Sequence, residues 1–199
     1  MRRLQFIMTK ACSVVYNVML LMCLLSLHSA YVHATGTVGA SRSERGALKV
    51  LYWATQGPTW KQQWDVQNVL SDPCLNNWYG IVCDHTGHIK SIHLANNNLM
   101  GSIPPEFPRP GLRFLKELDL SSNFLTGPLP DTLSLLRGLL VLRLDRNNFL
   151  GQVPATLSQL RFLEFLEIQG NQFDAVQGEI LPEEVKALGR NGRCHLIDR

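Results

Sequence analysis

The chain has 199 residues, of which 45% are hydrophobic, with 19 Lys and Arg against 16 Asp and Glu. Three of the basic residues lie in residues 1–34, which contain no acidic residue, so the remaining chain carries 16 charges of each sign. This balance gives no support to nucleic-acid binding, which relies on clustered, uncompensated positive charge. Phosphate-binding loops, dinucleotide fingerprints and kinase motifs are also absent from the sequence.

Residues 1–34 are predicted to be a secretory signal peptide. Basic residues precede an apolar stretch over residues 11–27, and the small residues around Ala34 offer a cleavage point before Thr35. The mature protein is therefore expected to be secreted. The alternative is a membrane anchor formed by an uncleaved signal, although 17 apolar residues are at the lower limit for crossing a bilayer of about 30 Å. The polar end of the chain suggests neither a second span nor a lipid anchor.

Residues 35–88 are predicted to form an amino-terminal cap that begins with a helix. Ser41 and Glu44 have the spacing of a capping box, and Gly57 and Pro58 should end the helix. Four later residues fall on one face of that helix and should be buried: Leu48, Leu51, Tyr52 and Thr55.

Four tryptophans supply the cap with large apolar surfaces. We expect them to form its core, with a sugar-stacking platform as the alternative. They are Trp53, Trp60, Trp64 and Trp78.

Two of the five cysteines precede residue 35, and three remain. Cys74 and Cys83 lie close together in the cap and should form a disulfide in an oxidising compartment. With His85 and His88 they could also be written as a zinc site, but their spacing departs from that of zinc-binding motifs. No metal site is predicted. Cys194 is left without a partner, and the options are a free thiol, an intermolecular disulfide or an incomplete carboxyl-terminal cap, of which an exposed free thiol is favoured.

A repeat of about 24 residues occupies residues 89–173. Three copies follow the frame LxxLxLxxNxLxGxIP, a fourth loses it after Phe173, and the key asparagines are separated by 26, 24 and 24 residues. Apolar residues at positions 4 and 6 of the frame alternate with polar ones, which predicts one short strand per copy. Such strands cannot bury a face alone, so the copies should stack around a shared core as an α/β solenoid with a parallel sheet.

The asparagine at position 9 lies where each strand ends. Its amide can donate and accept hydrogen bonds, so stacked copies can satisfy turn backbone groups hidden from water. A ladder of four is predicted: Asn97, Asn123, Asn147 and Asn171. Leucines spaced three apart after the Gly-x-x-Pro segments, such as Leu133 and Leu136, should form helix-like segments that close each coil.

The repeats and the cap segments ALKVLYWATQGPTW and DPCLNNWYGIVCD resemble those of plant-type extracellular leucine-rich-repeat proteins, from Ser41 to Phe173. The resemblance implies a short superhelix with its parallel sheet on the concave face. It also implies recognition of a protein or peptide without enzymatic activity or a cofactor. Its two forms are a co-receptor-like ectodomain and an inhibitor of the polygalacturonase-inhibiting kind, with a receptor ectodomain or a secreted enzyme as partner.

Positions 3, 5 and 7 of each copy should point away from the core and line the concave face. Val141 and Phe165 are one coil apart and could form an apolar patch beside Arg143, which is the anatomy of a protein-binding site. The predicted protein-binding residues are Leu140, Val141, Arg143, Phe165, Glu167, Asp119 and Glu117. The alternative is a solvated face with scattered apolar residues.

Two other functions have weaker support in the sequence. His93, Asp119 and a nearby serine contain the residue types of a catalytic triad, but no nucleophile or oxyanion motif accompanies them, so no catalytic residues are assigned. A structural surface or matrix component, linked through Cys194, is the alternative function. Residues 174–199 are predicted to be a carboxyl-terminal cap, with a short helix over Glu183 to Leu188.

Overall fold

The computed structural model describes residues 38–108, 111–175, 179–190 and 194–198, with Arg190 described by its backbone alone. The predicted signal peptide lies outside these residues. Gly39–Arg199 form one compact unit, and the fold below is that of this unit.

The cap begins with helix α2 (Arg42–Ala54), which has the predicted capping box. The Ser41 hydroxyl accepts a hydrogen bond from the Glu44 amide at 3.2 Å, and the Glu44 carboxylate accepts one from the Ser41 amide at 3.0 Å. The same carboxylate, almost fully buried, also accepts from the Ile89 amide at 3.0 Å. One side chain therefore joins the start of the helix to the first repeat strand. A single 3-10 turn, η1 (Gly57–Thr59), follows the helix.

Three of the four tryptophans form the predicted core of the cap. Trp60, Trp64 and Trp78 are buried, and Trp64 stacks on Trp78 with ring centroids 5.4 Å apart. Trp53 contradicts the prediction because it is 53% exposed. It follows Tyr52 by one residue, and a step of about 100° around the helix turns its ring away from the buried face.

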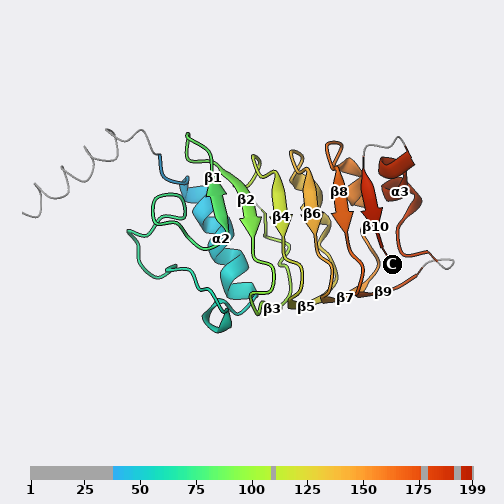
Figure 1. The fold of residues 1–199 in the computed structure, drawn as a ribbon, viewed down its shortest axis with the longest axis horizontal. Helices are drawn as coiled ribbons and strands as arrows, with labels where there is room; N and C mark the ends of the chain where they lie inside the picture. The colour runs from blue at the N-terminus through green and yellow to red at the C-terminus, as the bar shows by residue number, and fades with distance from the viewer. Residues whose placement is uncertain (1–37, 109–110, 176–178, 191–193, 199) are drawn as a thin grey trace, which may run out of the picture. The chain divides into compact units, whose positions relative to one another are not determined.

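The repeat strands build a six-stranded sheet in the order β1-β2-β4-β6-β8-β10 (Figure 1). β1 pairs antiparallel with β2, and the later strands are parallel. A Cys74–Cys83 disulfide ties β1 to the preceding cap segment. The strands are β1 (Ile81–Cys83), β2 (Ile89–His93), β4 (Glu117–Asp119), β6 (Val141–Arg143), β8 (Phe165–Glu167) and β10 (His195–Ile197).

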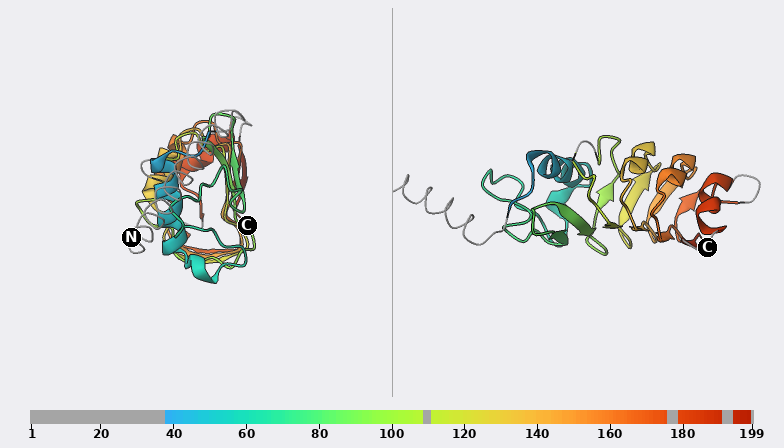
Figure 2. Two further views of the ribbon diagram at one scale, coloured as in Figure 1. Left: turned by 90° about the vertical axis from the view of Figure 1, so that its left-hand side faces the viewer. Right: turned by 90° about the horizontal axis from the view of Figure 1, so that it is seen from above.

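Each coil then contributes to a second parallel sheet, in the order β3-β5-β7-β9. Its strands are β3 (Met100–Gly101), β5 (Phe124–Gly127), β7 (Asn148–Gly151) and β9 (Gln172–Phe173). The predicted helix-like segments are the 3-10 helices η2 (Asp131–Leu135) and η3 (Ala155–Gln159). The end-on view in Figure 2 shows the coils superimposed around a shared interior, which the buried repeat leucines fill.

The four asparagines form hydrogen bonds between successive coils. Asn123 accepts from the amides of Asn97 and Leu99 at 2.9 and 3.0 Å, and its amide nitrogen donates to the Leu94 carbonyl at 2.8 Å. Asn147 and Asn171 make equivalent bonds to the coils before them. The first asparagine instead contacts the cap, since Asn97 accepts from the Gln62 amide at 2.7 Å.

The carboxyl end is closed by helix α3 (Glu183–Arg190) and by β10, which the sequence did not predict. Cys194 is buried beside them, so the prediction of an exposed thiol is wrong. The added strand carries Cys194 into the last layer of the core, and burial raises the pKa of its thiol to about 11.

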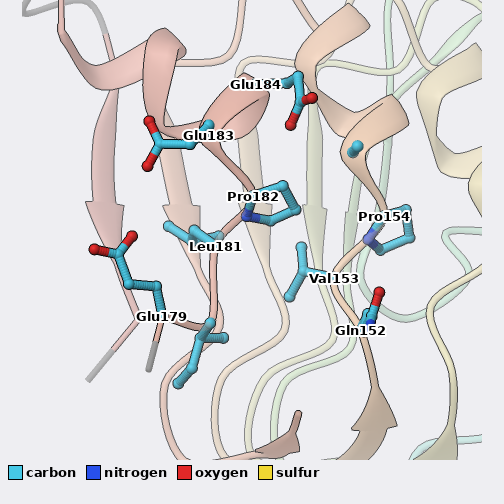
Figure 3. A pocket seen from close by; sticks show the side chains of 10 residues that line it. Gln152, Val153, Pro154, Glu179, Leu181, Pro182, Glu183 and Glu184 are labelled. Carbon is cyan, nitrogen blue, oxygen red and sulfur yellow. The ribbon is translucent and has the colours of Figure 1, made fainter. Parts of the chain in front are cut away.

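A pocket of about 560 Å³ remains between η3 and α3. In Figure 3, Val153 and Pro154 lie on one side of it and Leu181 and Pro182 on the other.

Candidate functional site

The exposed face of the six-stranded sheet carries two rows of side chains. Leucine and isoleucine at the middle position of each strand are fully buried, as at Leu118, Leu142 and Leu166, so their neighbours point to the opposite, concave face. Strand register aligns the first row as Ser91, Glu117, Val141, Phe165 and His195. It aligns the second row as His93, Asp119, Arg143, Glu167 and Ile197.

An apolar strip lies at the carboxyl-terminal end of this face. Val141 and Phe165 are register partners on adjacent strands, and Phe165 is 37% exposed. The ring of His195 stacks on Phe165 at a centroid distance of 5.2 Å. Ile197, which is 43% exposed, extends the strip, and Leu140 is half-buried at its margin.

Sequence reasoning missed three residues of this face. His195 and Ile197 are on β10, and Val82 is on β1, where it pairs with Ser91 at the opposite edge. Neither strand carries the repeat frame, so no periodic signal marked these residues. A weak alternation in the segment His195 to Ile197 was the one available indication.

The charged side chains in the middle of the face contact oppositely charged or hydrogen-bonding partners on adjacent strands. The Arg143 Nε donates to Glu167 at 3.0 Å, and its Nη1 lies 3.9 Å from Asp119. The hydrogen bond to Glu167 raises the pKa of Arg143, with the charges of both carboxylates acting in the same direction against the effect of burial. His93 Nε2 lies 3.1 Å from Glu117.

Two buried acceptors lie next to these pairs. Within the described residues, Asp145 Oδ1 and Gln169 Oε1 are the buried side-chain atoms without a hydrogen-bond partner. They stand two residues beyond the ends of β6 and β8. Burial raises the pKa of Asp145, and the charge of Glu167 acts in the same direction. Buried polar atoms are normally paired, so each of these two acceptors lowers the stability of the fold at this position.

The geometry does not assemble the residues of a catalytic triad. His93 contacts Glu117, and the Ser121 hydroxyl donates to Asp119 at 2.6 Å. Because His93 and Ser121 contact different carboxylates, these contacts form no chain of hydrogen bonds from a nucleophile through a base to an orienting carboxylate. The disulfide removes both thiolates from the zinc set, and the described residues contain no group of three or more potential metal ligands.

Comparison with known proteins assigns the family. The family model described as "Leucine-rich repeat and WD repeat-containing protein 1, LRR" matches residues 80–187. A leucine-rich repeat receptor-like serine/threonine-protein kinase of Arabidopsis thaliana is 42% identical over 69 residues, covering 35% of this chain and 6% of the kinase. A probable receptor-like kinase of the same plant is 33% identical over 107 residues, covering 53% and 10%. This chain thus spans a tenth or less of these relatives.

Solved structures give the same assignment. The BIR2 ectodomain of Arabidopsis thaliana superposes with a TM-score of 0.62 at 27% identity, covering 76% of this chain and 77% of that one. A chain of the BIR3–SERK2 complex from the same plant gives 0.62 at 26% identity, covering 72% and 75%. None of the helices in the described part of this chain has the length and apolarity needed to cross a membrane. The chain belongs to the leucine-rich-repeat family, in its plant-type form.

Proposed function

We propose that the protein is a non-enzymatic recognition module that binds a protein or peptide on its concave face. The observation that carries the proposal is the apolar strip of Val141, Phe165 and His195 beside the paired Arg143 and Glu167. Apolar anchors rimmed by charged residues are typical of protein-binding sites. The similarity to the BIR2 ectodomain and to the BIR3–SERK2 complex supports this kind of role.

The charged centre limits the chemistry of the ligand. Arg143 already has two carboxylate partners, so a ligand carboxylate would compete with Glu167 and Asp119. The bound segment should therefore combine apolar side chains for the strip with few carboxylates near Arg143.

The domain organisation and location belong to the same proposal. Residues 1–34 direct the chain to secretion, residues 35–88 cap the solenoid, residues 89–173 form the repeats and residues 174–199 close it. The Cys74–Cys83 disulfide supports an oxidising compartment. The burial of Cys194 counts against the alternative of a matrix component that is cross-linked through this thiol.

The test is a capture experiment with the secreted protein as bait and extracellular proteins of its own source as prey. The SERK2 ectodomain serves as one defined probe. Val141→Glu combined with Phe165→Glu places two charges in the strip and should abolish capture of any partner that binds there. Phe124→Glu is the matched control, because Phe124 is 57% exposed on β5 of the second sheet. Equal capture by all three proteins would contradict the concave site.

A further inference from the structure

A turn of the cap presents two apolar side chains to solvent. Val69 and Leu70 are 80% and 79% exposed, the highest values among the exposed large hydrophobic residues of the described chain. Turns are normally built from glycine, proline and small polar residues. Because both side chains lie almost wholly in solvent, neither has a packing role within this molecule. We call Val69 and Leu70 the apolar turn.

Hydrogen bonds fix the apolar turn to the cap. The side-chain oxygen of Asn68 accepts from the Leu70 amide at 3.0 Å, and its backbone carbonyl accepts from the Ser71 amide at 3.1 Å. The Ser71 hydroxyl accepts from Nε1 of the buried Trp78 at 2.8 Å. Since the turn is tied to the tryptophan core, its two apolar side chains are held outward before any partner binds, which lowers the entropic cost of a contact.

The pocket between η3 and α3 lies at the other end of the solenoid. Figure 1 shows the segment between η1 and β1, which contains the apolar turn, at the end away from α3. The pocket has a volume of about 560 Å³, and its apolar lining includes Val153, Ile180 and Leu181. A cavity of about 150 Å³ already holds a six-carbon ring. The pocket therefore has room for both side chains of the apolar turn.

The rim of the pocket is acidic. Among the described residues that line it, three are glutamates and none is basic. Figure 3 shows the carboxylates of Glu179, Glu183 and Glu184 around the pocket. Lys186, outside the lining, pairs with the first two. A group that enters this pocket is therefore favoured if it is apolar and carries positive charge beside it.

Positive charge lies at the base of the apolar turn. The guanidinium of Arg45 is 3.8 Å from the carboxylate of Asp72, in the segment that follows the turn. The Oδ1 atom of that carboxylate already accepts from three backbone amides, so it compensates the arginine only in part. Arg42 is exposed one helical turn earlier on α2. The amino end thus offers apolar groups and cations together.

We propose that the apolar turn of one molecule docks in the pocket of a second copy, so that the protein associates head to tail. The pocket calls for an apolar group with adjacent positive charge, and the opposite end of the same chain presents both on a fixed turn. A contact between two different surfaces leaves one turn and one pocket free at the ends of every assembly. Association therefore continues beyond a dimer. The proposal does not rest on the concave site, which takes no part in this contact.

The experiment is sedimentation velocity of the secreted protein over about a hundredfold range of concentration. The contact is smaller than a standard interface, so association should be weak. We expect the mean sedimentation coefficient to rise with concentration, with species larger than a dimer at the upper end. Val69→Ser combined with Leu70→Ser removes the apolar groups and should weaken association at least about tenfold.

A variant of the pocket tests the other side of the contact. Ala155 is exposed on η3 and lines the pocket, so Ala155→Trp fills the space without replacing a buried side chain. It should weaken association to the same extent as the variant of the turn. The Val141→Glu and Phe165→Glu double variant should associate as the wild type does, which separates this proposal from the concave site.

Two matched controls exclude a general effect of surface substitution. Phe124→Ser removes an exposed apolar side chain on β5, away from both ends. Ala187→Trp adds the same ring at an exposed position of α3 that does not line the pocket. Both variants should associate as the wild type does. If the controls lose association as strongly as the turn and pocket variants, with all folds intact by circular dichroism, the assigned contact is wrong.

Mixing the two defective proteins gives the sharpest test. The turn variant keeps an intact pocket, and the pocket variant keeps an intact turn. Their mixture should form a one-to-one dimer and nothing larger, because the free ends of that dimer are both defective. A mixture that stays monomeric at concentrations where the wild type associates would contradict the docking of turn into pocket.

Three results with the wild type would also overturn the proposal. One is a monomer at every concentration. Another is a dimer that does not grow, since this would indicate a symmetric contact. The third is binding to phosphatidylcholine vesicles that the turn variant loses, without self-association, because the apolar turn would then be a membrane contact.

Discussion

The two ends of the solenoid are closed in different ways. The amino end has its own core, built from three buried tryptophans, a disulfide and a carboxylate that joins helix α2 to β2. The carboxyl end extends the repeat sheet by β10 and covers the last coil with α3, next to a pocket of about 560 Å³. A cap outside the repeat pattern must supply its own core, whereas a cap that continues the sheet shares the core of the repeats.

The largest loss of stability is expected for a substitution at Trp64, inside the core of the cap. Replacing Trp64 by alanine should lower the free energy of unfolding by about 3 to 5 kcal/mol, because the cavity in this well-packed cluster cannot fully collapse. Chemical denaturation measures the change. Trp53→Ala is the control and should cost about 1 kcal/mol, since its ring is 53% exposed and contacts only the edge of the cluster at Tyr52. Similar losses in both variants would contradict the distinction.

Loss of the Cys74–Cys83 disulfide should have the next largest effect. The bond closes a short loop in the unfolded chain, so replacing both cysteines by serine should lower the free energy of unfolding by about 2 to 3 kcal/mol. A reductant should destabilise the wild type and leave the double variant unaffected. Hydrogen exchange should report the change first in the cap.

Shortening a buried side chain at the carboxyl end should lower the free energy of unfolding by less. Val185 is fully buried under α3, and Val185→Ala should lower the free energy of unfolding by about 1 to 2 kcal/mol. Hydrogen exchange should accelerate in α3 and β10 while the cap amides remain protected. Faster exchange in α2 of this variant would show that the two ends unfold together.

The smallest effect concerns Cys194. Its thiol has a raised pKa of about 11, so it stays protonated and hidden at pH 8, and iodoacetamide should modify it only after denaturation. In the unfolded chain the thiol ionises first, so the stability that it contributes is present below about pH 9 and is lost as the pH rises towards 11. Rapid alkylation of the native protein, followed by mass spectrometry, would contradict this burial.

The repeat region was predictable because its information is local and periodic. The positions of the four asparagines and of the buried leucines follow from a frame that recurs along the chain, and the structure has them as expected. The capping box at Ser41 was also local, since its two partners are three residues apart.

The two edge strands could not be predicted, because β1 and β10 exist through pairing with β2 and β8. For the same reason the sequence did not predict the burial of Cys194 or the place of His195 and Ile197 on the concave face.

The asparagine ladder gives the solenoid a polarity. Each asparagine satisfies backbone groups of the coil before it, and Gln62 of the cap occupies the first place in that series. In a 24-residue unit inserted between two coils, the asparagine would accept hydrogen bonds from backbone amides of the coil before it. The backbone amides of its own turn would donate to the asparagine of the next coil. The array can be lengthened internally without redesigning either end, so the concave face would grow by one strand with each added coil.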